Sequence, residues 1–496
     1  MVTSQRDLKL LDYVFHPRSI AVIGASNDEK KYGYRAVSVL KTQHFKGNIY
    51  PVNPSADMIC GLKSYPSVKH IPGKVDLAQI MVPAPLVPAM VKDCLSKGVK
   101  IAHIYTSGFS EAGKDGKMLE DQIVRIAGRG DLRIVGPNCL GTYCSRCRLA
   151  LNHRVGMEVG DVAFVSQSGG LTSSLIQAGN VRGFAFSKAI SVGNCADLGL
   201  VEFLEYMASD AETEIIAMYI ESLRGDGRRF FNVLRKTTRK KPVVIFKSGN
   251  TRRGREVAAS HTGALTGDYV IWKTVLSQAG AIEVRSLAEM ADVISGLKRL
   301  HPIPGKRSLA IIGNGGGQSV ISADMCSEFN LDLNDLSAHT KRKLKSLQLP
   351  AGTSTKNPID LPASVLRRKE GHFFKAVLEG VTSDRSIGAV VLNLEMETII
   401  YDRSAENPSI HYLVNMVKAA AEARSPTCAV MVVLRSSDDP KLQSLKEEIA
   451  MRAKRLAMPV YWDLRSGLKA LEKIIYYSDY LRRNRFPKWT GGGNGT

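Results

Sequence analysis

The sequence predicts an α/β protein built from parallel β-sheets with helices on both faces. Short apolar runs recur along most of the chain, each followed by a glycine-containing or polar turn and then by an amphipathic stretch. The runs are apolar without alternation, which is typical of strands buried on both faces of a sheet. A length of 496 residues is enough for roughly two to four domains, each able to bury its own core.

The first series of predicted strands ends at Asn138. Helical stretches such as residues 86–98 separate the runs, as expected when each parallel crossover contains a helix. We expect the five runs to form one parallel sheet. With their turns, they are Ser19–Ser26, Gly47–Pro54, Leu77–Pro85, Ile101–Gly108 and Leu132–Asn138.

Two further series follow the same rhythm, separated by the proline-containing link HPIPGKRS (301–308). The second comprises Val162–Gly170, Phe184–Gly193, Glu214–Ser222 and Pro242–Gly249. The third comprises Leu309–Gly317, Ile387–Glu395, Cys428–Ser436 and Met458–Leu464. We therefore predict three domains, residues 1–149, 150–302 and 303–496, the last ending in a disordered tail, TGGGNGT.

The composition indicates a cytoplasmic protein without a membrane segment. Apolar residues make up 44% and charged residues 23% of the chain, as in ordinary globular proteins. No apolar run reaches the roughly 18 residues of a membrane helix, and the N-terminus lacks the pattern of a secretion signal. The eight cysteines are scattered, which favours free thiols in a reducing compartment.

One cysteine spacing raises the possibility of a metal centre. Cys139, Cys144 and Cys147 have the spacing of part of a plant-type iron–sulfur site. However, Cys139 ends a predicted strand, and a fourth ligand would have to come from a remote segment. We therefore expect no metal site, and we interpret His103 as a core residue and His16 as a loop or surface residue.

The net charge of +21 raises the question of a nucleic-acid partner. The basic residues form short clusters that are spread along the chain, and no nucleic-acid-binding motif accompanies them. We expect neither a nucleic acid nor a membrane as partner. Small anionic ligands, an acidic protein partner or a solvated basic surface are sufficient explanations for the charge.

The segment VAASHTGALTG (257–267) is the strongest indication of chemistry in the chain. It places His261 among small residues, shortly after the predicted strand in residues 242–249. Small residues let the backbone approach another surface closely, whereas bulky apolar neighbours usually hold a structural histidine. We predict that His261 is a nucleophile that carries a transferred group on a mobile loop, about residues 250–267.

The motif SQSGG (166–170) joins a predicted strand to a helix. Ser168 could cap the helix while the amides of Gly169 and Gly170 face outward. Such a helix N-terminus suits a phosphoryl group. A simple N-cap serine is the alternative interpretation.

Glu221 ends the predicted strand in residues 214–222. A carboxylate at this edge could accept a hydrogen bond from an imidazole, fix its tautomer and raise its nucleophilicity. Asp197 is a weaker candidate for the same role.

Further small and polar residues follow the strands of the first series. In open parallel sheets, ligands bind beyond the carboxyl ends of the strands. These residues would line that edge for a nucleotide-like ligand, although turns alone also use proline and glycine. They include Gly24, Ala25, Ser26, Asn53, Pro83, Ser107 and Asn138.

In the third domain, Asn314–Gln318 (NGGGQ) has three glycines that suit either a ligand or a domain interface equally well.

Together, HPRSIAVIGAS, YPVNP, GPNCLG, VSQSGG, YIES and ASHTGALTGD resemble the ADP-forming (NDP-forming) acyl-CoA synthetase family, relatives of succinyl-CoA synthetase. The resemblance runs to about residue 475. It implies a CoA-binding Rossmann-like domain followed by two flavodoxin-like domains. It also implies that His261 is the phosphohistidine, that Ser168, Gly169 and Gly170 hold its phosphate, and that Glu221 orients the imidazole. The residues listed for the first sheet would lie along CoA.

The resemblance also implies the reaction. A carboxylic acid, CoA and ATP would be interconverted with acyl-CoA, ADP and phosphate through a phosphohistidine and an acyl phosphate. Fused family members continue into an ATP-grasp domain, for which no stretch of this chain is long enough. We therefore expect a separate ATP-grasp β subunit that binds ATP and Mg²⁺, in an α2β2 assembly.

Two other functions agree less well with these motifs. A non-catalytic CoA- or acyl-CoA-binding regulatory subunit is the alternative, although it would not need His261, Glu221 and SQSGG together. A dinucleotide-dependent oxidoreductase would require G-x-G-x-x-G and an acidic residue after the second strand, where this chain has Asn53.

Overall fold

The computed structural model describes residues 5–262, 267–300, 303–401 and 409–489. The predicted disordered tail, 490–496, lies outside these residues. The chain divides into two compact units, one of Met1–Asn180 with Ala185–Met290 and one of Val181–Phe184 with Ala291–Thr496. Among the described residues, no helix is long and apolar enough to cross a membrane.

The first unit begins with a five-stranded parallel sheet in the order β2-β1-β5-β6-β7. Its strands are β1 (Ser19–Ile23), β2 (Asn48–Val52), β5 (Leu77–Ile80), β6 (Ile101–Ile104) and β7 (Arg133–Val135). Its helices are α1 (Gln5–Phe15), α2 (Tyr32–Thr42), α3 (Val87–Lys97) and α4 (Lys114–Ala127), and short elements are β3 (Met58–Ile59), β4 (Leu62–Lys63), η1 (Val68–His70), η2 (Ala84–Leu86) and η3 (Ser110–Ala112).

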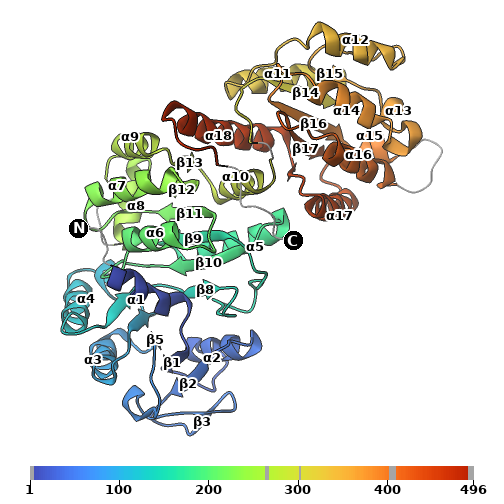
Figure 1. Cartoon of the computed structure of the whole chain (residues 1–496). Coiled ribbons are helices and arrows are strands. Elements are labelled where there is room, and N and C mark those ends of the chain that lie inside the picture. The colour runs from blue at the N-terminus through green and yellow to red at the C-terminus, as the bar shows by residue number, and fades with distance from the viewer. Residues whose placement is uncertain (1–4, 263–266, 301–302, 402–408, 490–496) are drawn as a thin grey trace. The chain divides into compact units, whose positions relative to one another are not determined.

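Both faces of this sheet are covered, as the unbroken apolar runs predict. Ile20 and Val22 of β1 belong to one core cluster with residues of α1 and α2. Ala21 and Ile23, which point to the other face, belong to a cluster with residues of α3 and α4. Figure 1 shows this layering around β1 and β5.

The second sheet has six strands in the order β13-β12-β11-β9-β10-β8. The parallel strands are β9 (Val162–Ser166), β10 (Phe186–Ser191), β11 (Ile215–Ile220), β12 (Val243–Lys247) and β13 (Ile282–Val284). The edge strand β8 (Thr142–Cys144) is antiparallel, and it comes from the segment before the predicted boundary at residue 149. The helices are α5 (Gly169–Arg182), α6 (Leu200–Ser209), α7 (Gly227–Thr238), α8 (Arg252–Thr262) and α9 (Tyr269–Ala279).

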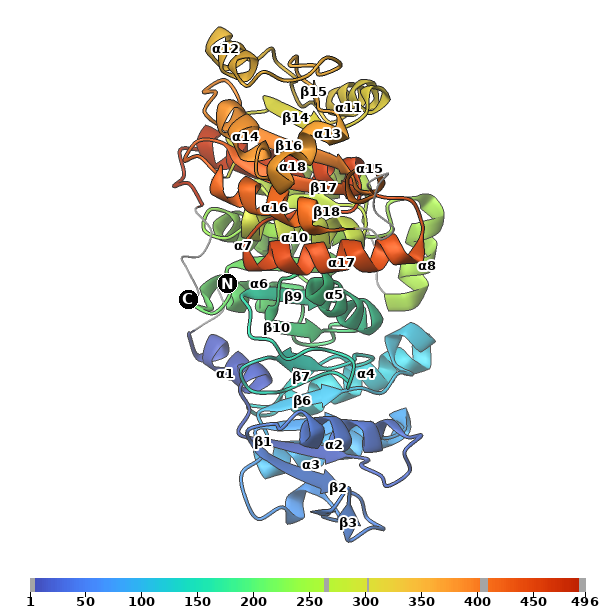
Figure 2. The same cartoon turned by 90° about the vertical axis from the view of Figure 1, so that its right-hand side faces the viewer.

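The second unit contains a parallel sheet in the order β15-β14-β16-β17-β18, and Figure 2 shows α11 and α14 on opposite sides of β14. The strands are β14 (Leu309–Gly313), β15 (Ile359–Asp360), β16 (Ala389–Glu395), β17 (Ala429–Arg435) and β18 (Val460–Tyr461). The helix α10 (Leu287–Arg299) begins in the first unit and ends in the second. The other helices of the second unit are α11 (Gly316–Glu328), α12 (Ala338–Ser346), α13 (Ala363–Leu366), η4 (Arg368–Gly371), α14 (Phe374–Thr382), α15 (Met396–Ile400), α16 (His411–Glu422), α17 (Pro440–Arg455) and α18 (Leu464–Arg483).

The three sheets share one strand order. When the parallel strands of each sheet are numbered along the chain, their spatial order is 2-1-3-4-5, which is the doubly wound order of flavodoxin-like folds. The direction of winding reverses between strands 1 and 3, and ligands bind at this switch point beyond the carboxyl ends. The switch points lie between β1 and β5, between β9 and β11, and between β14 and β16. The predicted α/β class with parallel sheets is confirmed.

Candidate active site at the carboxyl edges of two sheets

The SQSGG motif lies at the switch point of the second sheet, where β9 ends and α5 begins at Gly169. The Ser168 carbonyl accepts hydrogen bonds from both the amide (3.1 Å) and the hydroxyl (2.8 Å) of Thr172, which fixes the first turn of the helix. The Ser168 hydroxyl accepts a long hydrogen bond, 3.4 Å, from the Leu171 amide. Around Gly170 a side chain would meet nothing within 4 Å, so the helix N-terminus is open on that side. This geometry suits an anion.

Glu221 follows β11, the neighbouring strand at the same switch point, and is buried. The side-chain oxygen of Gln167 accepts hydrogen bonds from the amides of Glu221 (2.7 Å) and Ser222 (3.0 Å). Gln167 thus holds the end of β11 against the loop that leads into α5. The structure therefore brings Glu221 and the Ser168–Gly170 turn together. This agrees with the expectation that residues following parallel strands meet at one edge of the sheet.

The GPN turn after β7 in the first sheet lies against this edge of the second sheet. The Asn194 amide donates to the Pro137 carbonyl at 3.0 Å, and the Leu140 amide donates to the Ser191 hydroxyl at 3.1 Å. A Cβ on Gly169 would lie 2.5 Å from the Leu140 Cβ, so only glycine permits this close approach. The carboxyl edges of the first two sheets therefore adjoin at the GPN turn.

A buried polar network holds these two edges together. Glu120 of α4 accepts hydrogen bonds from the Ser110 hydroxyl (2.7 Å), the side-chain amide of Asn194 (3.0 Å) and the Arg224 guanidinium (2.6 Å). Burial by itself would raise the pKa of Glu120, but these hydrogen bonds and the Arg224 charge hold it below its usual value. Glu120 is therefore ionised at neutral pH. This network could not be predicted from the sequence, because its members are far apart along the chain.

Asp197, the weaker candidate for orienting an imidazole, forms an ion pair with a residue of the first sheet. It pairs with the Arg133 guanidinium (2.7 Å) and accepts a hydrogen bond from the Ile134 amide (2.8 Å). These contacts tie Asp197 to β7 of the first sheet.

Lys247 is a functional candidate that the sequence interpretation missed. It ends β12 next to Glu221, is buried, and its Nζ donates to the Glu221 carbonyl at 2.9 Å. Burial lowers the pKa of Lys247 to about 8, with Arg255 acting in the same direction and Glu221 opposing it. A charged residue at the end of the apolar run PVVIFK was the available signal.

The segment that carries His261 is a helix, so the prediction of a loop over residues 250–267 is wrong for Arg252–Thr262. The Thr251 hydroxyl accepts a hydrogen bond from the Gly254 amide at 3.0 Å, which caps the start of the helix. The alanines of the segment also favour a helix. In this helix, α8, Ala258 is buried and faces Gly249, and α8 contacts η3. His261 follows three residues later in the same helix. Its side chain and residues 263–266 lie outside the described part of the chain, so its contact with Glu221 stays a prediction.

In the first sheet, the predicted ligand-facing residues all lie at the carboxyl edge. Gly24 follows β1 with φ +90°, and a Cβ there would meet the Met81 carbonyl at 2.8 Å, across the switch point. The Asn53 side chain, after β2, donates to the Ala25 carbonyl at 2.8 Å. The remaining residues of the set follow strands of the same sheet or the first turn: Ser26, Pro83, Ser107 and Asn138.

A cavity of about 210 Å³ opens beside this edge. Tyr32 and Tyr105 line it with ring centroids 5.2 Å apart, and the Arg35 guanidinium lies 5.6 Å from the Tyr32 ring. Burial raises the pKa of Tyr105 to about 12, so its phenol stays neutral. The sequence interpretation missed these three residues. The aromatic and cationic pair suits a base and a phosphate.

In the second unit, the glycines of NGGGQ open α11 at the corresponding switch point. The Gly315 amide donates to Asp360 at 2.9 Å, and the Glu395 amide donates to the Asn314 side chain at 2.8 Å. Arg435 pairs with Glu395 at 3.0 Å. These contacts hold Asn314 and Gly315 against neighbouring strands of their own sheet.

Comparisons with known proteins agree with this geometry. A CoA-binding domain model matches residues 18–145, and a model of the succinyl-CoA ligase-like flavodoxin domain matches residues 159–297. The structure is similar to that of the dinucleotide-forming acetyl-coenzyme A synthetase 1 of Candidatus Korarchaeum cryptofilum in complex with phosphate and ADP. The TM-score is 0.80 and the identity 30%, over 96% of this chain and 98% of that chain.

Two curated relatives are similar in sequence. The ADP-forming acetate–CoA ligase I of Archaeoglobus fulgidus is 38% identical over 384 residues, which are 77% of this chain and 54% of that protein. The chain thus spans about half the length of that relative. The α subunit of ADP-forming acetate–CoA ligase II of Pyrococcus furiosus is 42% identical over 369 residues, which are 74% of this chain and 79% of that subunit. Because it matches most of that α subunit at this identity, the chain belongs to the ADP-forming acyl-CoA ligase family.

Proposed function

We propose that the chain is the α subunit of an ADP-forming acid–CoA ligase and that His261 carries the phosphoryl group. One observation carries the proposal: the open N-terminus of α5 and the buried Glu221 share a switch point, and Gln167 fixes them to each other. A helix N-terminus beside an imidazole-orienting carboxylate is the environment that a phosphohistidine needs.

The proposed reaction has three steps, and each step releases a defined leaving group. The His261 imidazole attacks the γ-phosphorus of ATP, and ADP leaves. The carboxylate of the acid takes the phosphoryl group and becomes an acyl phosphate. The CoA thiol, after loss of its proton, then attacks the acyl carbon and expels phosphate, which gives acyl-CoA. Each step also runs in reverse.

Residues of this chain have separate roles in the proposal. The amides of Gly169 and Gly170 and the Ser168 hydroxyl would bind the phosphoryl oxygens. Glu221 would accept the imidazole N–H, and Lys247, when protonated, would offset negative charge near that site. These roles rest on the positions described above.

CoA would lie along the carboxyl edge of the first sheet. Its approach would be closest at Gly24, Ala25, Ser26, Asn53, Pro83, Ser107 and Asn138. Arg35 and the Tyr32–Tyr105 pair in the adjoining cavity would contact its charged and aromatic parts. The thiol end would then reach the GPN turn, which adjoins the Ser168–Gly170 turn.

ATP and Mg²⁺ would be bound by a separate ATP-grasp β subunit, in an α2β2 assembly. The name of the P. furiosus relative as an α subunit supports a partner of this kind. We also propose the three-domain division at residues 149 and 302, with the phosphohistidine segment in the second domain.

The test is phosphoryl labelling. The chain, purified under mild conditions from its native host so that a partner is retained, is incubated with γ-labelled ATP and Mg²⁺. We expect an acid-labile, base-stable label on the wild-type chain, no label on His261→Ala, and a slower appearance of label on Glu221→Gln. Addition of CoA and an acid should discharge the label.

An unlabelled wild-type chain that binds CoA and has retained its partner would contradict the proposal. It would favour the alternative of a non-catalytic CoA-binding regulatory subunit. Label that persists in His261→Ala would place the phosphoryl group on another residue.

A further inference from the structure

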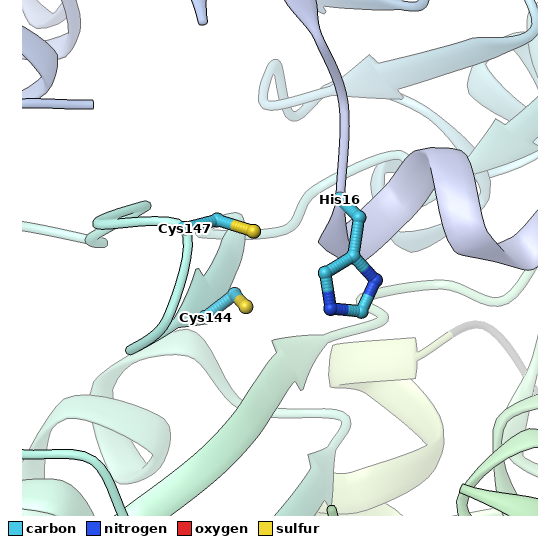
Figure 3. Close-up of side chains that lie close together, drawn as sticks. All are labelled: His16, Cys144 and Cys147. Carbon is cyan, nitrogen blue, oxygen red and sulfur yellow. The ribbon is translucent and has the colours of Figure 1, made fainter. Parts of the chain in front are cut away.

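Two cysteines and a histidine that the proposed function does not use lie together in the first unit. Ligand atoms of His16, Cys144 and Cys147 all lie within 4.8 Å of one another. Figure 3 shows the sulfur atoms of both cysteines on the side that faces the His16 ring. His16 directly follows α1, Cys144 ends β8, and Cys147 lies in the turn after β8.

The backbone around each of the three residues is fixed. Cys144 and Leu149 exchange backbone hydrogen bonds of 2.8 and 3.0 Å, which close the turn that contains Cys147. The Lys46 amide donates to the Cys147 carbonyl at 3.3 Å, and the His16 amide donates to the Asp12 carbonyl at 2.7 Å. Cys144 is fully buried, whereas the His16 side chain keeps 34% of its surface exposed. The cluster is therefore a built site with one open side.

Carboxylates surround the imidazole at second-sphere distances. The Asp12 Oδ1 lies 3.9 Å from Nδ1 of His16, and the Glu212 Oε2 lies 3.9 Å from Nε2. Asp12 is held by the Tyr206 hydroxyl at 2.7 Å, and Glu212 by Lys188 at 2.5 Å. A carboxylate that orients the second nitrogen is the usual support of a metal-bound histidine.

The distances between the three ligand atoms and their chemical types indicate which metal the cluster would bind. In a tetrahedral zinc site, Zn–S bonds of about 2.3 Å and Zn–N bonds of about 2.0 Å put the ligand atoms roughly 3.5–4 Å apart. The three atoms here are within about an ångström of that spacing. Two thiolates and one imidazole form a soft set that suits Zn²⁺ and does not suit Mg²⁺ or Ca²⁺. Cys139, the third cysteine of the sequence motif, instead donates to the Ile104 carbonyl.

We propose that His16, Cys144 and Cys147 bind a zinc-class divalent cation, with water or the Glu212 carboxylate as fourth ligand. On binding, the two thiols lose their protons to solvent and the neutral imidazole donates a lone pair, so the two thiolates balance the charge of the divalent ion when water is the fourth ligand. The ion links the end of α1 to β8 of the second sheet. It is a structural site, and none of its three ligands belongs to the elements proposed to hold the phosphoryl group.

The test uses the full chain under reducing conditions, with Co²⁺ and Zn²⁺ as probes. We expect one Co²⁺ per chain with a thiolate-to-metal absorption band that Zn²⁺ abolishes. Zn²⁺ should raise the Tm and a chelator should lower it. His16→Ala and Cys147→Ser should each weaken Co²⁺ binding by roughly tenfold or more. Cys60→Ser, which changes another partly buried free thiol in the same unit, is the matched control and should bind as the wild type does.

Alkylation gives a readout that does not depend on the variants. Zn²⁺ should protect Cys147 from a thiol reagent and leave Cys60 unprotected. A wild-type chain that binds no Co²⁺, equal protection at both cysteines, or a Cys144–Cys147 disulfide that forms instead of a metal complex would overturn the proposal. Labelling of His261 is unaffected in each case, so the two proposals fail independently.

Discussion

At the scale of single residues, Lys247 couples the proposed phosphoryl site to pH. Its folded pKa of about 8 is below the ordinary lysine value, so it loses its proton, and its positive charge, as pH rises through about 8. If the cation offsets phosphoryl charge, labelling should be fastest below that pH and slow above it. Lys247→Met should slow labelling roughly ten- to a hundredfold at pH 7 and should remove the alkaline limb.

Lys241 provides the control for this prediction. It lies just before β12, at the opposite end of the strand, and its Nζ donates to the carbonyls of Met207 (2.9 Å) and Asp210 (2.6 Å). Lys241→Met should leave the pH profile of labelling unchanged. A wild-type profile that is flat between pH 7 and 9 would show that the Lys247 charge does not act on the phosphoryl group.

Gly24 makes a second prediction at this scale. Its φ of +90° and the nearby Met81 carbonyl mean that any side chain must displace β1 or β5 at the switch point. Gly24→Ala should therefore weaken CoA binding by roughly tenfold, as measured by calorimetry. Gly98→Ala, at φ +76° with nothing within 4 Å, imposes comparable backbone strain away from the site. It should lower the Tm slightly and leave CoA affinity intact; equal losses in both variants would exclude a local effect.

At the scale of elements, the strands were predictable and the segment around α8 was not. Strand ends carry turn residues, and parallel topology sends all of them to one edge, so Gly24, Asn53 and Glu221 could be placed from the sequence alone. The small residues before His261 were interpreted as backbone freedom, although alanine also favours helix. The network around Glu120 leaves no periodic signal, because its partners come from three separate segments, which follow β6, β10 and β11.

The network around Glu120 joins α4 to the loops after β10 and β11, so it should affect the stability of the fold. The folded pKa of Glu120 is below its unfolded value. Its contribution to stability is therefore complete above about pH 5 and is lost as pH falls through the folded pKa. Glu120→Gln should lower the free energy of unfolding by about 1–3 kcal/mol at pH 7 and flatten its decline toward pH 3.

Urea unfolding at a series of pH values measures this effect. Asp121→Asn removes an exposed carboxylate on the same helix, which pairs with Lys117 at 2.5 Å. It should shift the free energy of unfolding by less than about 0.5 kcal/mol. If Glu120→Gln and Asp121→Asn gave the same pH profile, the buried network would not be what joins the two edges.

At the scale of the whole molecule, one strand order repeated three times explains why the sequence predicted the class so well. Unbroken apolar runs, crossover helices and turn residues recur because each sheet is doubly wound. The strand order itself, and the antiparallel addition of β8 to the second sheet, depend on tertiary pairing that no local pattern encodes.

The assignment of CoA to the first sheet and of ATP to the proposed β subunit predicts which ligand the chain binds without its partner subunit. The proposed CoA contacts all come from the first sheet and its adjoining cavity, so the chain without its partner should bind CoA in calorimetry. ATP with Mg²⁺ should give no comparable heat until the β subunit is added, because the proposed nucleotide site belongs to that subunit. Gly24→Ala should reduce the CoA signal and leave ATP labelling in the complex intact. Tight ATP binding by the chain without a partner would instead place a nucleotide site within these three sheets and would remove the need for a transfer between subunits.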